Sequence, residues 1–414
     1  MAEFPVDVVR RKFPALNRSE SSLFFDNAAG AQIPQTVFDA ITGHLLRRNV
    51  QRGGRYRESR EVDAEIASAR QTVATFLNAA EPDEVAFGMN ATSFIRLVSL
   101  ALSQRFADRR EIVVSDLDHE ANIATWMALE REGAIIRWWN VREDGSLHLS
   151  DLEPLLSSRT RLVACTAASN ALGTVIDVAG VAQRAHAAGA EVFLDCVQYA
   201  PHGLVDVQKW GCDYLVCSGY KIFAPHMGFL WGRRTALDAL PTFREDFIPN
   251  APPFKIEVGT FVYENVAGMR AAIEYLADLG AICDGSQAQA AQRKHLAAAM
   301  QAIHEYETTL TMALLQGLRS IKGATVYGLQ DPQTSHLRVP TVCFNLRSVS
   351  PDQVTTRLAD KGIAVRDGNM YAPRLMKRLG LSPDSGAVRA SLVHYNTLDE
   401  IRLFLGELQE IAGQ

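Results

Sequence analysis

Short apolar runs alternate with longer amphipathic stretches between about residues 70 and 235. Helical periodicity covers 122–133 and 178–189, and four apolar runs between such stretches predict β-strands: 111–115, 160–166, 191–195 and 214–217. Short strands that alternate with helices are typical of a mainly parallel α/β sheet. In such a sheet, ligands bind beyond the carboxyl ends of the strands.

The remainder of the chain has a different pattern. Residues 241–253 are rich in proline and lack periodicity, which predicts a long crossing loop. A long helical pattern over about 287–318 then leads to a strand-like run at 340–345 and a closing helix from Leu398. We predict a large domain at 21–285 and a smaller C-terminal α+β domain at 286–414, with which residues 1–20 pack.

The composition is that of an ordinary globular protein, with 414 residues of which 47% are hydrophobic and 21% charged. A net charge of -5 without a long basic run argues against nucleic-acid binding. The sequence has no apolar segment long enough for a membrane span and no signal-type amino terminus, so we expect a cytoplasmic enzyme. The six cysteines form no CxxC pair and predict buried core thiols rather than disulfides or zinc ligands, so no metal site is expected.

A lysine and an acid follow two of the predicted strands. Lys221 comes just after 214–217 in a Ser-Gly-Tyr-Lys turn, and Asp195 ends 191–195. This pair suits pyridoxal phosphate (PLP), because a lysine forms a Schiff base with its aldehyde and an acid keeps its pyridine nitrogen protonated. The alternative for Asp195 is a cap on the following helix.

A turn of small residues before the helix-like run 94–102 is a candidate phosphate site. Backbone amides and the helix dipole favour an anion there, so Asn90, Ala91 and Thr92 are expected to hold the cofactor phosphate. The alternative is a helix N-cap at Thr92 or Ser93 without a ligand.

Four further polar residues are candidates near the cofactor. His119 follows a strand and could stack on the pyridine ring and relay protons, although a lone histidine is more often a surface or core residue. Asn170 and Gln198 could bind the phenolic oxygen or the substrate, or could form loop hydrogen bonds. Arg389 lies in an apolar strand-like run, where it could bind an amino-acid carboxylate or form an internal salt bridge.

Together these residues resemble the class V aminotransferase family of fold type I PLP enzymes, and most of all its cysteine desulfurase and selenocysteine lyase branch. The resemblance covers nearly the whole chain. Its markers, in order, are 25–29, 90–93, 118–122, 169–173, Asp195 with Gln198, 218–221, 257–260, 389–392 and 395–397. The resemblance implies a large domain with a mainly parallel, seven-stranded type of sheet.

The resemblance also implies roles for individual residues. Lys221 would be the Schiff-base lysine, Asp195 the pyridinium partner, His119 the stacking residue and Arg389 the ligand of the substrate carboxylate. The phosphate contacts would come from Thr92, Ser218 and Tyr220. Thr260 would reach the phosphate of the other subunit, which implies a homodimer with shared sites. Asn27, Arg55 and Arg366 are expected to contact the substrate.

The chain departs from this branch at the position of its catalytic cysteine. The segment Arg-x-Gly-x-x-Cys-Ala here reads Arg366-Asp367-Gly368-Asn369-Met370-Tyr371-Ala372, so Tyr371 replaces the cysteine. A phenol has a pKa near ~10 and does not form a persulfide. Tyr220 and Arg55 also stand at histidine positions, which suggests a rebuilt substrate pocket.

Three functions are compatible with these residues. We expect a PLP-dependent C–S lyase that eliminates the β-substituent of a small amino acid without a persulfide step. The second is a class V aminotransferase or an amino-acid epimerase in which Tyr371 donates a proton. The third is a non-catalytic PLP-fold binding protein, which the joint retention of Lys221, Asp195, His119 and Arg389 disfavours.

Overall fold

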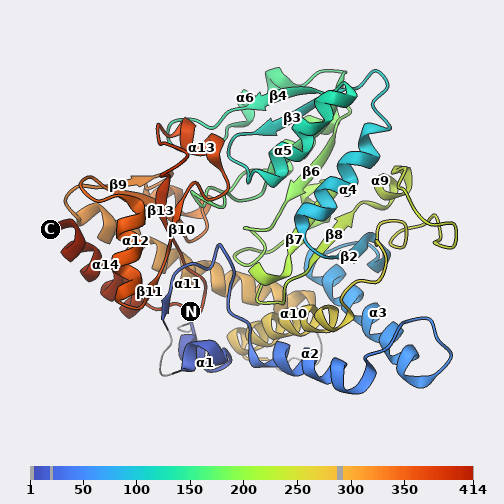
Figure 1. Ribbon diagram of the computed structural model, residues 1–414, viewed down its shortest axis with the longest axis horizontal. Helices are drawn as coiled ribbons and strands as arrows, with labels where there is room; N and C mark the ends of the chain where they lie inside the picture. The colour runs from blue at the N-terminus through green and yellow to red at the C-terminus, as the bar shows by residue number, and fades with distance from the viewer. Residues whose placement is uncertain (1–3, 19–21, 287–291, 414) are drawn as a thin grey trace.

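A seven-stranded sheet forms the centre of the computed structural model, which describes residues 4–18, 22–286 and 292–413 (Figure 1). The strand order is β2-β8-β7-β6-β5-β3-β4. The strands from β7 to β4 are parallel, and β8 is antiparallel to both of its neighbours. The bounds in that order are Val85–Gly88, Gly228–Gly232, Tyr214–Ser218, Glu191–Asp195, Thr160–Thr166, Glu111–Ser115 and Ile135–Trp139.

The predicted mainly parallel α/β sheet is thus confirmed. Three of the four predicted strands have the expected bounds, and β7 extends one residue further, to Ser218. The prediction did not identify β2, β4 and β8. β8 begins and ends with glycine, and β4 carries two tryptophans and an arginine, so neither shows the apolar run of a central strand.

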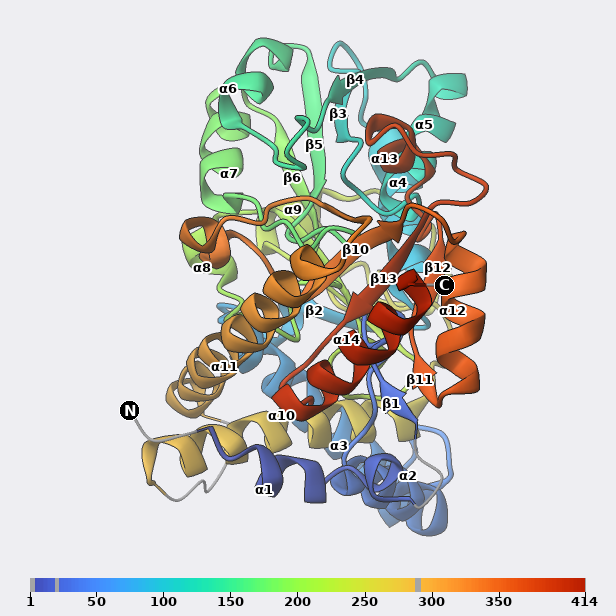
Figure 2. The same ribbon diagram turned by 90° about the vertical axis from the view of Figure 1, so that its left-hand side faces the viewer.

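Both faces of the sheet are buried, because its side chains alternate between two cores. On β3, Val113 packs in one core, whereas Ile112 and Val114 pack in the other. Helices α3 (Arg57–Leu77), α7 (Val178–Ala187) and α10 (Tyr263–Asp284) supply residues to the first core. Helices α4 (Ala91–Ser103) and α5 (Ala121–Met127) cover the opposite face, as Figure 2 shows.

A second, antiparallel sheet lies beside the first, in the order β12-β13-β10-β9. Its strands are Arg366–Gly368, Ala387–Ser391, Thr341–Leu346 and Ala324–Tyr327. Three helices share a core with it, namely α11 (Arg293–Ser320), α12 (Pro351–Asp360) and α14 (Leu398–Gly413). The start predicted for α11, over 287–291, lies outside the described residues. The strand at 340–345 and the helix from Leu398 were predicted from the sequence.

The amino-terminal segment contacts the second sheet. Helix α1 (Val6–Arg11) is fixed by Arg10, which donates to the Tyr395 carbonyl at 2.7 Å. Strand β1 (Leu23–Phe24) pairs in parallel with β11 (Ile363–Ala364), and Asp26 then forms a bridge with Ser391. These pairings place residues 26–29 beside the first sheet, between the two halves of the molecule.

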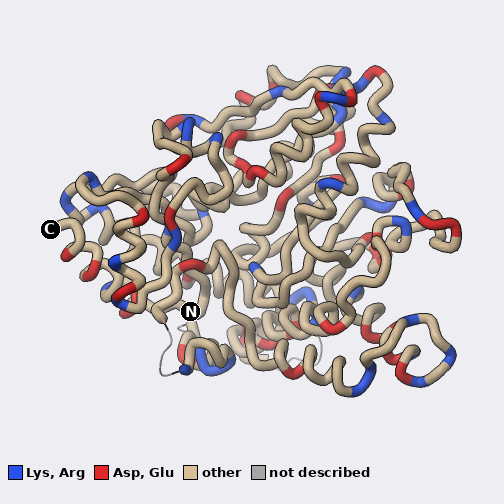
Figure 3. The backbone as a smooth tube through the Cα atoms, in the orientation of Figure 1, with Lys and Arg blue, Asp and Glu red and all other residues tan. Residues whose placement is uncertain are grey.

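The other elements are short or peripheral. Helix α2 (Gln35–Arg48) packs on α10, and α6, α8, α9 and α13 are brief helices at Leu149–Leu152, Val207–Trp210, Arg234–Ala239 and Pro373–Arg378. Residues 241–262 contain no helix or strand, as the proline-rich pattern of 241–253 predicted. Charges of both signs occur throughout the fold (Figure 3). Within the described ranges, no helix is both long and apolar enough to span a bilayer.

Candidate active site

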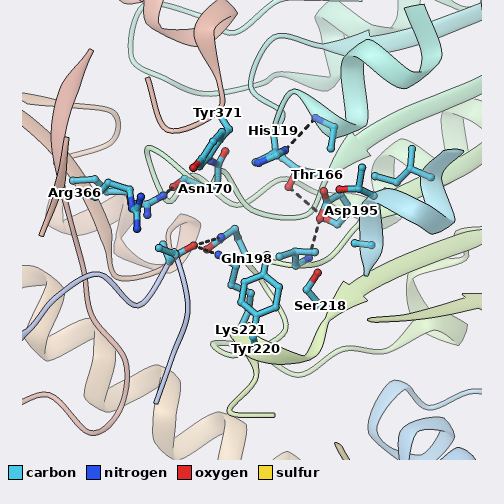
Figure 4. Close-up of a pocket in the computed structure, with 18 residues that line it drawn as sticks. His119, Thr166, Asn170, Asp195, Gln198, Ser218, Tyr220, Lys221, Arg366 and Tyr371 are labelled. Carbon is cyan, nitrogen blue, oxygen red and sulfur yellow. Dashed lines mark hydrogen bonds between the residues drawn. The ribbon is translucent and has the colours of Figure 1, made fainter. Parts of the chain in front are cut away.

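A pocket of about 340 Å³ lies where the carboxyl ends of β3, β5, β6 and β7 face the second sheet (Figure 4). This is the edge at which parallel sheets bind ligands. Twelve residues proposed from the sequence line it: Ala91, Thr92, His119, Asn170, Asp195, Gln198, Ser218, Tyr220, Lys221, Arg366, Tyr371 and Arg389.

Four other proposed residues do not line this pocket. The buried Asn27 donates to the Ser391 carbonyl at 2.8 Å and accepts from the hydroxyl of Tyr395. Asn90 is the N-cap of α4, where its side chain accepts from the Ser93 amide at 2.8 Å. Arg55 and Thr260 are exposed, on loops before α3 and α10. The pocket of a single chain therefore gives no support for a role of these four residues in binding substrate or phosphate.

Lys221 is a buried amine in a polar pocket. It follows β7 in a short 3-10 turn, and its Nζ donates to the Ala28 carbonyl. Burial, aided by the positive charges of Arg389 and Arg366, lowers its pKa to about 7. An amine with this pKa is largely neutral just above neutral pH, so it can act as a nucleophile and accept a proton.

Asp195 is a buried carboxylate at the end of β6. Its Oδ1 accepts the Val197 amide at 2.9 Å, so it forms a local turn rather than a helix cap. Burial raises its pKa to about 6. A cation that bonds to this carboxyl would favour its charged form, which is what a pyridinium nitrogen provides.

Asp118 is a second buried acid behind the pocket. It accepts from the Ser115 hydroxyl and from Asn122 Nδ2, the latter at 2.7 Å. Burial raises its pKa to about 8, with a smaller contribution from the charge of Asp195. At neutral pH Asp118 is therefore mainly protonated, which removes a negative charge near Asp195.

The start of α4 provides backbone amides at the pocket wall. The Ser93 amide is capped by Asn90, whereas Ala91 and Thr92 both line the pocket. Gly228 on β8 permits this approach, because a Cβ there would lie 2.6 Å from the carbonyl carbon of Asn90. A helix N-terminus held in this way is suited to an anion such as a phosphate.

The rings of His119 and Tyr371 lie against each other in the lining of the pocket. Their ring centroids are 5.6 Å apart with 34° between the planes. His119 Nδ1 accepts the Ala121 amide at 3.1 Å, which leaves Nε2 to carry the proton of the neutral ring. Burial lowers the pKa of His119 to about 4, with further effects of Lys221 and Arg389, so the ring is neutral at physiological pH.

Two arginines in the pocket share one carboxylate. Asp26 accepts from Arg366 Nη2 at 2.8 Å and from Arg389 Nη2 at 3.1 Å. The internal salt bridge that was the alternative role of Arg389 is therefore present. Arg389 also donates from Nη1 to the Asn170 carbonyl at 2.9 Å, but its Nε is buried without a partner.

Sequence reasoning did not select Asp26, Ala28, Asp118 or Thr166, which also contribute to the site. Thr166 is the last residue of β5, a strand that the apolar pattern predicts, so its place at this edge could have been found. Ala28 lies in the 25–29 marker, and its carbonyl accepts from Lys221 and from Gln198 Nε2. Asp26 lies in the same marker, but no local pattern identifies its two partners.

The residues present fit PLP. The pocket contains a buried amine of lowered pKa, a buried carboxylate of raised pKa and a helix N-terminus. Two buried polar atoms in the lining, Asn170 Oδ1 and Arg389 Nε, have no partner within the protein, and a polar ligand would supply one. Each of the six cysteines lies in the described part of the chain, and none lines the pocket.

Comparisons with known proteins agree with this geometry. The sequence profile described as aminotransferase class-V matches residues 23–297 and 288–404. A probable cysteine desulfurase of Synechocystis sp. is 35% identical over 97% of this chain and 94% of its own. An aminotransferase-like protein of Gibberella zeae is 32% identical over 99% of both chains. The apo structure of a cysteine desulfurase from Thermococcus onnurineus superposes with a TM-score of 0.88 at 27% identity, over 100% of this chain and 99% of that one.

Proposed function

Because the chain belongs to the class-V aminotransferase family of PLP-dependent enzymes, we propose that it eliminates a sulfur substituent from the β-carbon of a small amino acid, without a persulfide step. The observation that carries this proposal is Tyr371. It lines the pocket where a desulfurase of the resembled branch has its cysteine, and no thiol lines the pocket.

The cofactor, when bound, supplies an electron sink for the carbanion that forms at the substrate α-carbon. Lys221 would hold it covalently, Asp195 would bond to its pyridine nitrogen, and the α4 amides would bind its phosphate. His119 lies on the side of the pocket where its ring could cover the cofactor ring. The unpaired Nε of Arg389 is available for the substrate carboxylate.

Lys221 is the base in this proposal. Once the substrate amine has replaced it on the cofactor, its Nζ would be a free amine again and would accept the α-proton of the substrate. Burial of this amine, which lowers its pKa to about 7 in the cofactor-free chain, favours the neutral form that a base requires. The Cβ–S bond then breaks, and its electron pair leaves with the sulfur. The hydroxyl of Tyr371 does not capture that sulfur, so sulfide or a thiol leaves the pocket and the released enamine hydrolyses to pyruvate and ammonia.

Product analysis tests this function. PLP-loaded protein is incubated with L-cysteine and with S-substituted cysteines, and pyruvate, ammonia, alanine and sulfide are assayed. Pyruvate and ammonia in equal amounts are expected. Alanine in place of pyruvate would contradict the proposal. Lys221→Ala with added PLP is the control, because it separates enzymatic turnover from the background reaction of free cofactor.

Aminotransfer is the second candidate, favoured by the aminotransferase-like relative from Gibberella zeae. An aminotransferase would convert an α-keto acid to an amino acid and would release no pyruvate from cysteine without such an acceptor. Epimerisation needs a proton donor on the face opposite Lys221. Tyr371 could serve, because its ring faces the pocket from the second sheet (Figure 4).

A homodimer with shared sites is part of the proposal. Thr260 and Arg55 lie on exposed loops outside the pocket of their own chain, so a second copy could receive them. Large apolar side chains are exposed near these loops, including Val258, which is 73% exposed. Light scattering of the purified protein tests the dimer, and a monomeric mass with full activity would contradict shared sites. A cytoplasmic location stays a prediction.

A further inference from the structure

The turn that carries Tyr371 has a strained backbone. Met370 and Tyr371 have φ values of 55° and 57°, in the left-handed region, and neither is glycine. Each such residue costs about 1–2 kcal/mol, and two in succession persist only where surrounding contacts hold them.

Contacts within the turn hold part of it. The Tyr371 amide donates to Asn369 Oδ1 at 3.0 Å, and the Ala372 amide donates to the Asn369 carbonyl at 2.8 Å. The Met370 side chain is anchored in the first core. These contacts fix the amides of Tyr371 and Ala372 and the side chain of Met370. The carbonyls of Met370 and Tyr371 are bonded by other parts of the chain.

Both carbonyls are held by loops of the first sheet. Asn170 Nδ2 donates to the Met370 carbonyl at 2.5 Å, and the Glu120 amide donates to the Tyr371 carbonyl at 2.7 Å. Asn170 follows β5 and Glu120 follows β3, so two strand ends of the pocket edge hold the turn. Figure 4 shows Asn170 directly beside Tyr371.

Asn170 contacts the turn and the pocket with the same amide group. A carbonyl only accepts, so the bond to Met370 fixes the amide nitrogen toward the turn. The Oδ1 atom is then buried without a partner, in a side chain that lines the pocket. The amide nitrogen also has a second N–H, and the Asn170 carbonyl holds Arg389.

We propose that Asn170 is a positioning residue that couples occupancy of the pocket to the Met370–Tyr371 turn. A ligand that bonds to the free amide atoms of Asn170 fixes the rotamer that holds the Met370 carbonyl. The turn is then less mobile, and Tyr371 stays against His119. The coupling is reciprocal, because a turn that holds Asn170 in place favours the same ligand. The inference rests on the proposed function only in that PLP and an amino acid are the ligands.

Hydrogen exchange of the full-length protein, resolved by peptide, tests this coupling. The reporters are the amides of Glu120, Tyr371 and Ala372, whose bonds define the turn. Asn170→Asp keeps the side-chain shape but removes both N–H donors and places a carboxylate against the Met370 carbonyl. We expect these amides to exchange about tenfold faster in the cofactor-free variant than in cofactor-free wild type. In wild type, adding PLP should slow them.

Gln198→Glu is the matched control. Gln198 lines the same pocket and also donates its amide to a backbone carbonyl, that of Ala28 at 2.9 Å, but within the described ranges it forms no hydrogen bond with the turn. It should leave the exchange of the turn as in wild type. Equal acceleration in both variants, or none in Asn170→Asp, would overturn the inference.

The two proposals fail separately. Visible absorbance of the bound cofactor reports whether PLP binds. The comparison of the cofactor-free proteins decides whether Asn170 holds the turn, whether or not Asn170→Asp binds PLP. If wild type itself binds no PLP, the proposed function fails, while the exchange rates of the cofactor-free proteins still decide whether Asn170 holds the turn. If wild type binds PLP without slower exchange of the turn, the coupling fails while the function stands.

Discussion

Replacing Asp26 by asparagine should destabilise the protein strongly, because Asp26 neutralises a buried guanidinium. Arg389 is buried, with 3% of its side chain exposed, and among the described residues its ion-pair partner is Asp26, at 3.1 Å. Asparagine keeps the shape of the side chain but removes the charge. Removal of one partner of a buried ion pair costs about 3–5 kcal/mol, because the other charge is left uncompensated.

This loss of free energy of unfolding corresponds to a shift of the melting temperature. An unfolding entropy of roughly 2.1 cal/mol/K per residue gives about 0.9 kcal/mol/K for a chain of this length. If the chain unfolds in one transition, Asp26→Asn should lower the melting temperature by about 3–6 °C. Calorimetry of the cofactor-free protein measures this shift without a contribution from ligand binding.

Two control variants isolate the buried pair. Arg366→Gln removes the other partner of Asp26. Because the Arg366 side chain is 40% exposed, this change should lower the free energy of unfolding by less than about 1 kcal/mol. Asp399→Asn breaks an exposed pair with Arg402 and should leave the melting temperature unchanged. The reasoning is refuted if Asp26→Asn has the same melting temperature as wild type, or if Arg366→Gln lowers the melting temperature more than Asp26→Asn does.

Three further predictions concern the pocket. Lys221→Ala should abolish covalent attachment of PLP, so an unchanged visible band and unchanged borohydride sensitivity would disprove the assignment. Tyr371→Phe should retain β-elimination, because the hydroxyl does not act in it, whereas loss of an epimerase activity in this variant would identify Tyr371 as the proton donor. Asp118 has a pKa raised from 3.8 to about 8 in the folded chain, so the native state binds the extra proton and its stability falls as pH rises between these values. Asp118→Asn should remove that slope, so its melting temperature relative to wild type should be higher at pH 8 than at pH 5, and an equal difference at both pH values would contradict the burial of a protonated acid.

The parts of the fold that the sequence could predict are those encoded by local patterns. The central strands are apolar on both faces, so β3, β5 and β6 were predicted with their bounds. The edge strands β2 and β4 and the interior strand β8 carry glycine, charge or tryptophan, so local pattern does not distinguish them from loops. Their place in the sheet is set by pairing, which only the folded chain shows.

The same division holds at the pocket. Lys221 and Asp195 could be found because Asp195 ends one apolar strand, Lys221 lies in the turn after another, and parallel strands end at one edge. Asn170 was also found in this way, as a polar residue after β5. Its contact with Met370, 200 residues further along the chain, has no local signal.

Asp26 and Asn27 show that the register between distant segments of the chain determines which residue reaches the arginines of the pocket. They are neighbours in one marker segment, and sequence reasoning selected Asn27. The pairing of Asp26 with Ser391 aligns this segment with β13, so Asp26 lies near Arg389 while Asn27 bonds to Tyr395 and Asn396. A shift of one residue would exchange these environments and leave the arginine facing an amide. The electrostatic balance of the pocket therefore depends on a contact between segments that lie more than 360 residues apart.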